Sequence, residues 1–153
     1  MHWSETIAKK IIERNPNKEE YVCAAGISPS GSIHIGNFRD VATSYFVVKA
    51  LRKMGKKARL LFSWDEYDRL RKVPVNVAKA KEGMDKYIGY PYVDVENPFD
   101  DRPECKNYAE YFEAEFMDSI DKFGIDMDYR HQAEMYRSGK YTQHILTALK
   151  KRG

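Results

Sequence analysis

The sequence predicts an α/β fold in which helices flank a parallel, Rossmann-like sheet. Apolar runs of strand length alternate with longer runs of helical period along the chain. This alternation is typical of parallel strands that are joined by right-handed helical crossovers. The 153 residues suit one domain with its own core, which amounts to about one half of a doubly wound sheet.

The first predicted helix covers residues 4–14. Ser4 is a suitable N-cap residue, because its hydroxyl can accept a hydrogen bond from a free N–H of the first turn. The Asn-Pro-Asn sequence at 15–17 ends this helix. Its apolar stripe comprises Ile7, Ile11 and Ile12.

A buried strand is predicted over residues 21–26, and a long helix follows from Ile35 to Met54. Gly55 is a suitable residue to end that helix, because glycine readily adopts the left-handed conformation of the C′ position. We expect the buried side of this helix to comprise Ile35, Phe38, Ala42, Tyr45, Phe46 and the stem of Lys49.

The second half of the chain continues the alternation. A second strand is predicted over 58–64, followed by an irregular insert over about 65–105, where prolines are frequent and loops of this length are often functional. Three further elements are then predicted: a helix over 106–123, a strand over 125–130 and a helix over 140–152. The inward side chains of the two helices are expected to be Phe112, Phe116, Ile120 and Phe123, and Ile145, Leu146 and Leu149.

Composition excludes several classes of protein. Hydrophobic residues make up 42% and charged residues 32%, which is typical of a soluble globular chain rather than a disordered one. No apolar run approaches the roughly 20 residues of a membrane span, and no secretory signal is visible. The only cysteines, Cys23 and Cys105, lie far apart and outside metal-type spacing, so we expect a reduced, cytoplasmic setting and no protein-bound metal.

The turn between the first strand and the long helix is the strongest candidate site. Free N–H groups at a helix N-terminus favour a bound anion, and a nucleotide phosphate is the natural ligand. His34 can offer an imidazole N–H to a phosphate oxygen, and Asn37 adds an amide. Gly36 leaves a bare backbone on which a base or ribose can lie.

The residues His34-Ile35-Gly36-Asn37 resemble the HIGH signature of class I aminoacyl-tRNA synthetases, with asparagine in the fourth position. The longer string from Gly26 to Arg39 resembles archaeal-type class I lysyl-tRNA synthetase more narrowly. The opening Met1-His2-Trp3 and the strings Phe62–Pro74 and Tyr136–Tyr141 resemble the same family, so the resemblance covers essentially the whole chain.

This resemblance implies a HIGH-superfamily nucleotide-binding fold that activates L-lysine with ATP and Mg²⁺ and transfers it to the acceptor end of tRNA(Lys). It implies His34 and Asn37 as catalytic residues. Asp65 matches an acidic residue that holds the substrate α-amino group in the similar glutamyl-tRNA synthetases, and Gly26 and Ser28 are expected to contact lysine. The implied ATP-binding residues are Pro29, Ser30, Gly31, His34, Gly36 and Asn37.

One signature of the family is missing. The string Lys53-Met54-Gly55-Lys56-Lys57 resembles its Lys-Met-Ser-Lys-Ser loop, but we interpret it as the basic end of a helix. We therefore expect the N-terminal part of the catalytic domain, without the C-terminal remainder of the enzyme and with little activity alone.

Two alternatives remain: a truncated paralogue that binds nucleotide or a partner without catalysis, and a small HIGH-superfamily nucleotidyltransferase. His131 and His144 are expected to have surface or packing roles, and Tyr136–Tyr141 has no assigned chemistry.

Overall fold

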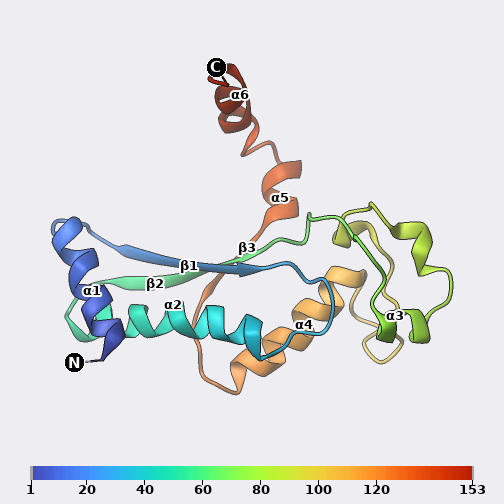
Figure 1. Ribbon diagram of the computed structural model, residues 1–153, viewed down its shortest axis with the longest axis horizontal. Coiled ribbons are helices and arrows are strands. Elements are labelled where there is room, and N and C mark those ends of the chain that lie inside the picture. Colours follow the sequence, from blue (N-terminus) through green and yellow to red (C-terminus); the bar gives the residue numbers. More distant parts are fainter. Residues whose placement is uncertain (1, 153) are drawn as a thin grey trace.

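The computed structural model describes residues 2–152 (Figure 1). Helices and strands alternate as predicted, but the insert over about 65–105 is not irregular throughout, because it contains the short helix α3 and two 3-10 helices, η1 and η2. None of the described helices is both long enough and apolar enough to cross a membrane. The elements are α1 Trp3–Arg14, β1 Tyr21–Ile27, α2 Ile35–Lys53, β2 Ala58–Trp64, α3 Val75–Ala80, η1 Met84–Tyr87, η2 Tyr92–Asp94, α4 Tyr108–Asp121, β3 Asp128–His131, α5 Gln132–Arg137 and α6 Thr142–Lys150.

The three strands form one parallel sheet in the order β1-β2-β3. The helices that connect them, α2 and α4, lie on the same face of the sheet (Figure 1). Crossovers between parallel strands are right-handed. When each new strand is added at the same edge of the sheet, right-handed crossovers place all their helices on one face. The predicted α/β class with a Rossmann-like parallel sheet is confirmed. The carboxyl ends of β1 and β2 lie side by side, because Ile27 pairs with Trp64.

The main core lies between this sheet and its helices. Alternate residues of β2 face α2 and α4 and are buried, as the pleat of a strand requires. Phe62 stacks on Phe116 of α4 with ring centroids 5.3 Å apart, and it meets Trp64 edge-on at 4.8 Å. The opposite face of the sheet is less covered by the described residues, and Val22 of β1 is 39% exposed there.

The insert has a small core of its own. It packs on the first half of α4, so that α4 contributes Phe112 to this second cluster and Phe116 to the main core. The Tyr108 hydroxyl donates a hydrogen bond of 2.8 Å to the carbonyl of Ser30, which ties the start of α4, against which the insert packs, to the turn after β1. The buried members of this cluster are Leu70, Val77, Met84, Tyr92, Val95, Tyr108, Ala109 and Phe112.

Two expectations about the first helices are wrong. His2, not Ser4, is the N-cap of α1, and the buried Ser4 lies in the first turn. The buried face of α2 is also only partly the expected one. Phe38 and Tyr45 do pack against the main core, but Ile35 is 79% exposed, and Phe46 packs at the surface against the rings of His2 and Trp3. The residues of α2 that are buried are Val41, Val47, Val48, Ala50 and Leu51.

The C-terminal elements also differ from expectation. Helix α4 ends at Asp121, so Phe123 lies beyond it, is 63% exposed and contacts Phe38 at a ring distance of 4.5 Å. The short helix α5 was not expected. Helix α6 stands away from the sheet (Figure 1), and its apolar residues Ile145, Leu146 and Leu149 are exposed rather than inward.

Candidate functional site

The turn between β1 and α2 fixes His34 through backbone capping. His34 is the N-cap of α2, and its Nδ1 accepts a hydrogen bond of 3.1 Å from the N–H of Gly36. The Asn37 side-chain oxygen accepts the N–H of His34 at 3.3 Å, which completes a capping box. Because Nδ1 acts as an acceptor, the neutral ring carries its proton on Nε2. The exposed imidazole can therefore donate a hydrogen bond to a ligand.

Gly36 has a structural role beside this ring. A Cβ built on Gly36 would lie 2.9 Å from His34 Cε1 and 3.0 Å from Nδ1. Real Cβ atoms essentially never approach this closely, so any larger residue would displace the imidazole. Gly36 therefore leaves free the space that the His34 ring occupies. This role comes in addition to the ligand contact that the sequence predicts for Gly36.

The loop that leads into this turn is held from several sides. Pro29 is buried, and the N–H of Ser30 donates to the carbonyl of Ser28 at 2.8 Å. The Ser28 hydroxyl donates to the Asp68 carboxylate at 2.7 Å, which connects the loop after β1 to the loop after β2. Gly31 lies next to Pro74 of the insert, with 3.5 Å between a built Cβ and the proline Cγ.

Asp65 lies at the carboxyl end of β2. Its backbone N–H donates to the carbonyl of Ile27 at 2.9 Å, which places it beside the exit of β1. Its carboxylate accepts a hydrogen bond of 3.1 Å from the Ser63 hydroxyl. Partial burial, together with the nearby Asp68 carboxylate, raises the pKa of Asp65, and the Ser63 hydrogen bond opposes this shift. Gly26 pairs with Ser63 across the sheet, so Gly26, Ser28 and Asp65 do lie at one edge, as expected.

A chain of hydrogen bonds reaches Asp65 from helices α5 and α6, which together we call the C-terminal arm. The Tyr141 hydroxyl donates to Gln132 Oε1 at 2.7 Å, and Gln132 Nε2 donates to the Ser63 hydroxyl. Ser63 in turn donates to Asp65, so all three bonds point toward the carboxylate. This arrangement orients Asp65 and gives Tyr141 a contact that the sequence did not explain.

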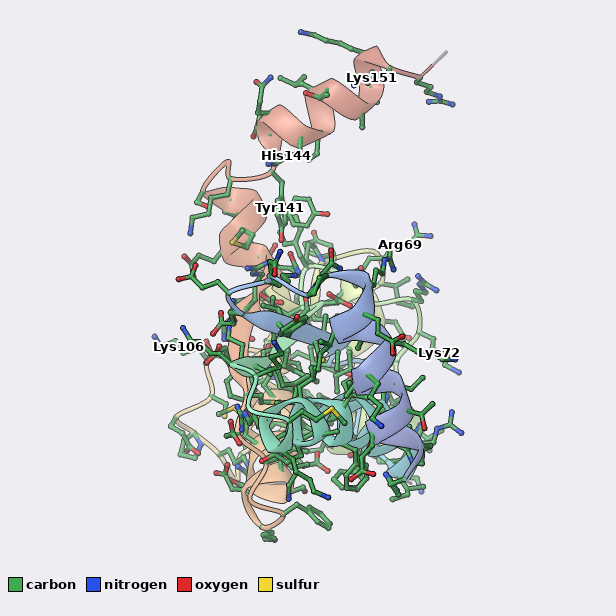
Figure 2. The ribbon with its side chains drawn as sticks, turned by 90° about the vertical axis from the view of Figure 1, so that its left-hand side faces the viewer. Arg69, Lys72, Lys106, Tyr141, His144 and Lys151 are labelled. Carbon is green, nitrogen blue, oxygen red and sulfur yellow. The ribbon has the colours of Figure 1, made fainter. Side chains whose placement is uncertain are left out.

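A cavity of about 620 Å³ opens between Asp65 and this arm. Tyr67 stacks on Tyr136 with ring centroids 5.2 Å apart, and Tyr136 meets Tyr141 edge-on at 5.1 Å. Figure 2 shows Tyr141 and His144 on the arm that rises from the body of the molecule. Carboxylates and aromatic faces together attract a cationic ammonium group. We call this cavity the acidic-aromatic pocket, and its lining is Asp65, Tyr67, Asp68, Gln132, Tyr136, Tyr141, His144, Ile145 and Ala148.

Glu66, which follows Asp65, is buried and holds the start of α5. It is 2% exposed, and its two carboxylate oxygens accept the N–H groups of Gln132 at 3.1 Å and Ala133 at 2.9 Å. His131 Nδ1 lies 3.8 Å from Glu66 and 3.7 Å from the buried Glu113 of α4. Glu66 therefore anchors one wall of the acidic-aromatic pocket. The sequence did not indicate this, because its partners are more than 60 residues away.

The stability of the chain is expected to depend on the protonation of Glu113. Burial, together with the negative charge of Glu66, raises the pKa of Glu113 from 4.5 to about 8. Between these values the folded chain holds a proton that the unfolded chain has lost. The free energy of unfolding should therefore fall as pH rises through this window, by at most about 1.4 kcal/mol per pH unit.

Denaturant unfolding at pH 5 to 8 checks this prediction with Glu113→Gln, which should remove the fall. The exposed Glu104 supplies the control, because Glu104→Gln should leave the pH dependence of the parent unchanged. Identical pH profiles for the parent chain and Glu113→Gln would show that Glu113 does not bind this proton in the folded state.

Comparison with known proteins decides the family. Residues 1–153 match the family described as tRNA synthetases class I (K). The chain belongs to the class I lysyl-tRNA synthetases. It is 45% identical over 154 residues to the lysine–tRNA ligase of Thermococcus kodakarensis, and 42% identical over 153 residues to that of Pyrococcus horikoshii. The lysine–tRNA ligase of Treponema pallidum is 40% identical over 152 residues.

These alignments cover 99% of this chain but 28% of each of the three relatives. The chain corresponds to the N-terminal catalytic region of class I lysyl-tRNA synthetases. Family membership confirms the resemblance that was based on the HIGH-like turn and the strings near Trp64 and Tyr136. The roles of the individual site residues remain predictions.

Proposed function

We propose that this chain forms the ATP- and lysine-binding part of a lysine–tRNA ligase. The observation that supports this proposal is the juxtaposition of two sites at one edge of the sheet. A capped helix N-terminus presents the Nε2–H of His34, and the acidic-aromatic pocket begins at Asp65 of the neighbouring strand. The Ser28–Asp68 hydrogen bond joins the two loops that carry these sites.

The residues of the turn suit the nucleotide. The His34 imidazole would donate to a phosphate oxygen, and Asn37 would hold the ring in place through its bond to the His34 backbone. The fixed loop of Pro29, Ser30 and Gly31 would border the nucleotide. Gly36 would leave space for the imidazole ring of His34. Mg²⁺ would arrive with the phosphates, and we assign it no side-chain ligand in this chain.

The acidic-aromatic pocket suits L-lysine. Asp65 would pair with the α-ammonium group, and Gly26 and Ser28 would border the substrate where β1 ends. The carboxylate of lysine would then attack the α-phosphorus of ATP in line and expel pyrophosphate, which gives lysyl-adenylate. The lysyl group would pass from the adenylate to the 3′ end of tRNA(Lys), with AMP as the leaving group. Such a reaction depends on positioning and on stabilisation of charge, so it needs no covalent intermediate with a side chain.

Two assays on this chain test the proposal. Calorimetry should detect ATP binding, and lysine-dependent exchange of pyrophosphate into ATP should be slow or absent, because no Lys-Met-Ser-Lys-Ser loop is present in the sequence. Exchange at the rate of a complete ligase would show that residues beyond this chain are unnecessary for activation. A folded chain without measurable ATP affinity would contradict the proposal.

A non-catalytic binding role is the alternative that the structure favours next. The partly uncovered face of the sheet and the exposed apolar residues of α6 both offer surface to a partner. Light scattering that shows a well-folded monomer, together with no ATP binding, would support this alternative. The family match over the whole chain favours both the ligase function and the non-catalytic binding role over a small nucleotidyltransferase.

A further inference from the structure

Three side chains that can ligate a metal meet where the C-terminal arm joins the sheet. Glu66 follows β2, Glu113 lies on α4, and His131 is the last residue of β3. Each offers one ligand atom, and the three atoms all lie within 4.8 Å of one another. We call these residues the Glu-Glu-His cluster. None of them lines the acidic-aromatic pocket.

The two carboxylates of this cluster differ from ordinary surface acids, because both are buried. Glu66 is 2% exposed and Glu113 is 7% exposed. Two buried negative charges at this distance repel one another strongly, since the protein interior screens them poorly. Without a cation one of them must hold a proton, which agrees with the raised pKa of Glu113. A divalent cation between the carboxylates would remove the same repulsion and take the place of that proton.

Glu113 is the member of the cluster without a hydrogen-bond partner. Within residues 2–152, no group donates a hydrogen bond to its carboxylate, and the only basic nitrogen within 4 Å is His131 Nδ1 at 3.7 Å. Glu66, by contrast, is held by two backbone N–H groups, which leave each of its oxygens a second lone pair. Buried polar groups nearly always have partners, so the bare carboxylate of Glu113 favours a cation beside it.

We propose that the Glu-Glu-His cluster binds a divalent transition-metal cation, and that Zn²⁺ is the ion its donor set suits best. An imidazole beside two carboxylates favours such a metal over Mg²⁺, which prefers an octahedron of oxygens. Tetrahedral Zn²⁺ bonds of about 2.0–2.2 Å place neighbouring ligand atoms roughly 3.3–3.6 Å apart. His131 Nδ1 already lies 3.8 Å from Glu66 and 3.7 Å from Glu113, so small side-chain rotations would complete this geometry.

The exposure of the cluster suits an ion that enters from solvent. The His131 side chain is 47% exposed, so water can reach the cluster on that side and fill the fourth ligand position. The bound ion would link the end of β2, the middle of α4 and the junction of β3 with α5. It would thereby reinforce the wall of the acidic-aromatic pocket that Glu66 anchors.

The sequence predicts no protein-bound metal, because ligand spacing along the chain shows only local sites. The ligands of the Glu-Glu-His cluster come from three separate elements, which the folded sheet brings together. The inference goes beyond the proposed function and does not depend on it, since neither His34 nor Asp65 belongs to the cluster. It would stand even if the chain did not bind ATP.

Calorimetric titration of the full chain with ZnCl₂, after EDTA treatment and dialysis, tests this inference. The parent should bind one Zn²⁺ per chain. Glu113→Gln/His131→Gln should bind it at least about a hundredfold more weakly, because even residues that only orient metal ligands contribute tenfold to a hundredfold. Free Zn²⁺ at about a hundred times the dissociation constant should raise the melting temperature of the parent by roughly 5–11 °C. The same Zn²⁺ should leave the melting temperature of the variant unchanged, and its melting in EDTA checks that it folds.

A matched control removes the same two kinds of side chain from exposed positions. Glu104→Gln/His144→Gln should bind Zn²⁺ within about twofold of the parent. Titration with Co²⁺ should give weak visible absorption without the intense ultraviolet band of a thiolate ligand, which excludes binding at Cys23 or Cys105. No Zn²⁺ binding by the parent, equal Zn²⁺ affinities in the two variants, or a thiolate band with Co²⁺ would overturn the inference.

Discussion

His34→Asn should weaken ATP binding by about tenfold to a hundredfold while leaving the fold intact. Asparagine is one of the best N-cap residues, so it can still accept the N–H of Gly36. It cannot replace the outward Nε2–H, and a hydrogen bond to a charged group contributes about 1.5–3 kcal/mol. Calorimetric titration with ATP measures the affinity, and thermal unfolding checks that the cap is retained.

His34→Ala provides the comparison, because it removes both the cap and the donor. It should lose the same ATP affinity as His34→Asn and also about 1 kcal/mol of stability. Equal ATP affinity in the parent and in both variants would show that His34 only caps the helix. A loss of affinity in His34→Ala alone would show that helix geometry, rather than the imidazole donor, matters for ATP.

Gly26→Ala should destabilise the chain by about 1–3 kcal/mol, which is the usual cost of forcing extra atoms into a packed site. A Cβ on Gly26 would lie 2.7 Å from the Ser63 carbonyl oxygen of the neighbouring strand. Backbone at that distance cannot move aside cheaply, so β1 and β2 would have to separate near Asp65. Thermal unfolding should show a lower melting temperature, by roughly 2–12 °C.

Gly31→Ala is the matched control for this substitution. A Cβ on Gly31 would meet only the Pro74 side chain at 3.5 Å, which is ordinary van der Waals contact. Its melting temperature should stay within about 2 °C of the parent. If Gly26→Ala were as stable as Gly31→Ala, the two strands would have to be more adaptable at their carboxyl ends than the close approach implies.

Local signals predicted much of the fold. The strand over 58–64 has the predicted bounds, and Gly55 does end α2 in the left-handed conformation, with φ of 73°. The errors concern contacts between distant residues. Periodicity shows that α6 has an apolar face but not whether other elements cover it. An imidazole cap such as His2 gives a weaker signal than a serine hydroxyl does, so the sequence points to Ser4 instead of His2.

The candidate site divides in the same way. The turn around His34 could be predicted, because strand, loop and helix N-terminus follow one another in the sequence. The support of Asp65 could not, because Ser63 receives its hydrogen bond from Gln132, a residue 69 positions later. The anchoring of α5 by Glu66 likewise joins segments that only the folded sheet brings together. The resemblance of Tyr136–Tyr141 to the family indicates that this segment matters, but it does not predict the contacts that the segment makes.

A crystal structure with a non-hydrolysable lysyl-adenylate mimic would test the central claim most directly. The adenosine and phosphate-like groups should lie against the β1–α2 turn, with a hydrogen bond from His34 Nε2. The lysyl group should extend into the acidic-aromatic pocket, with its α-ammonium at Asp65. Density for the mimic at any other surface of the chain, with the turn and the pocket empty, would contradict this account.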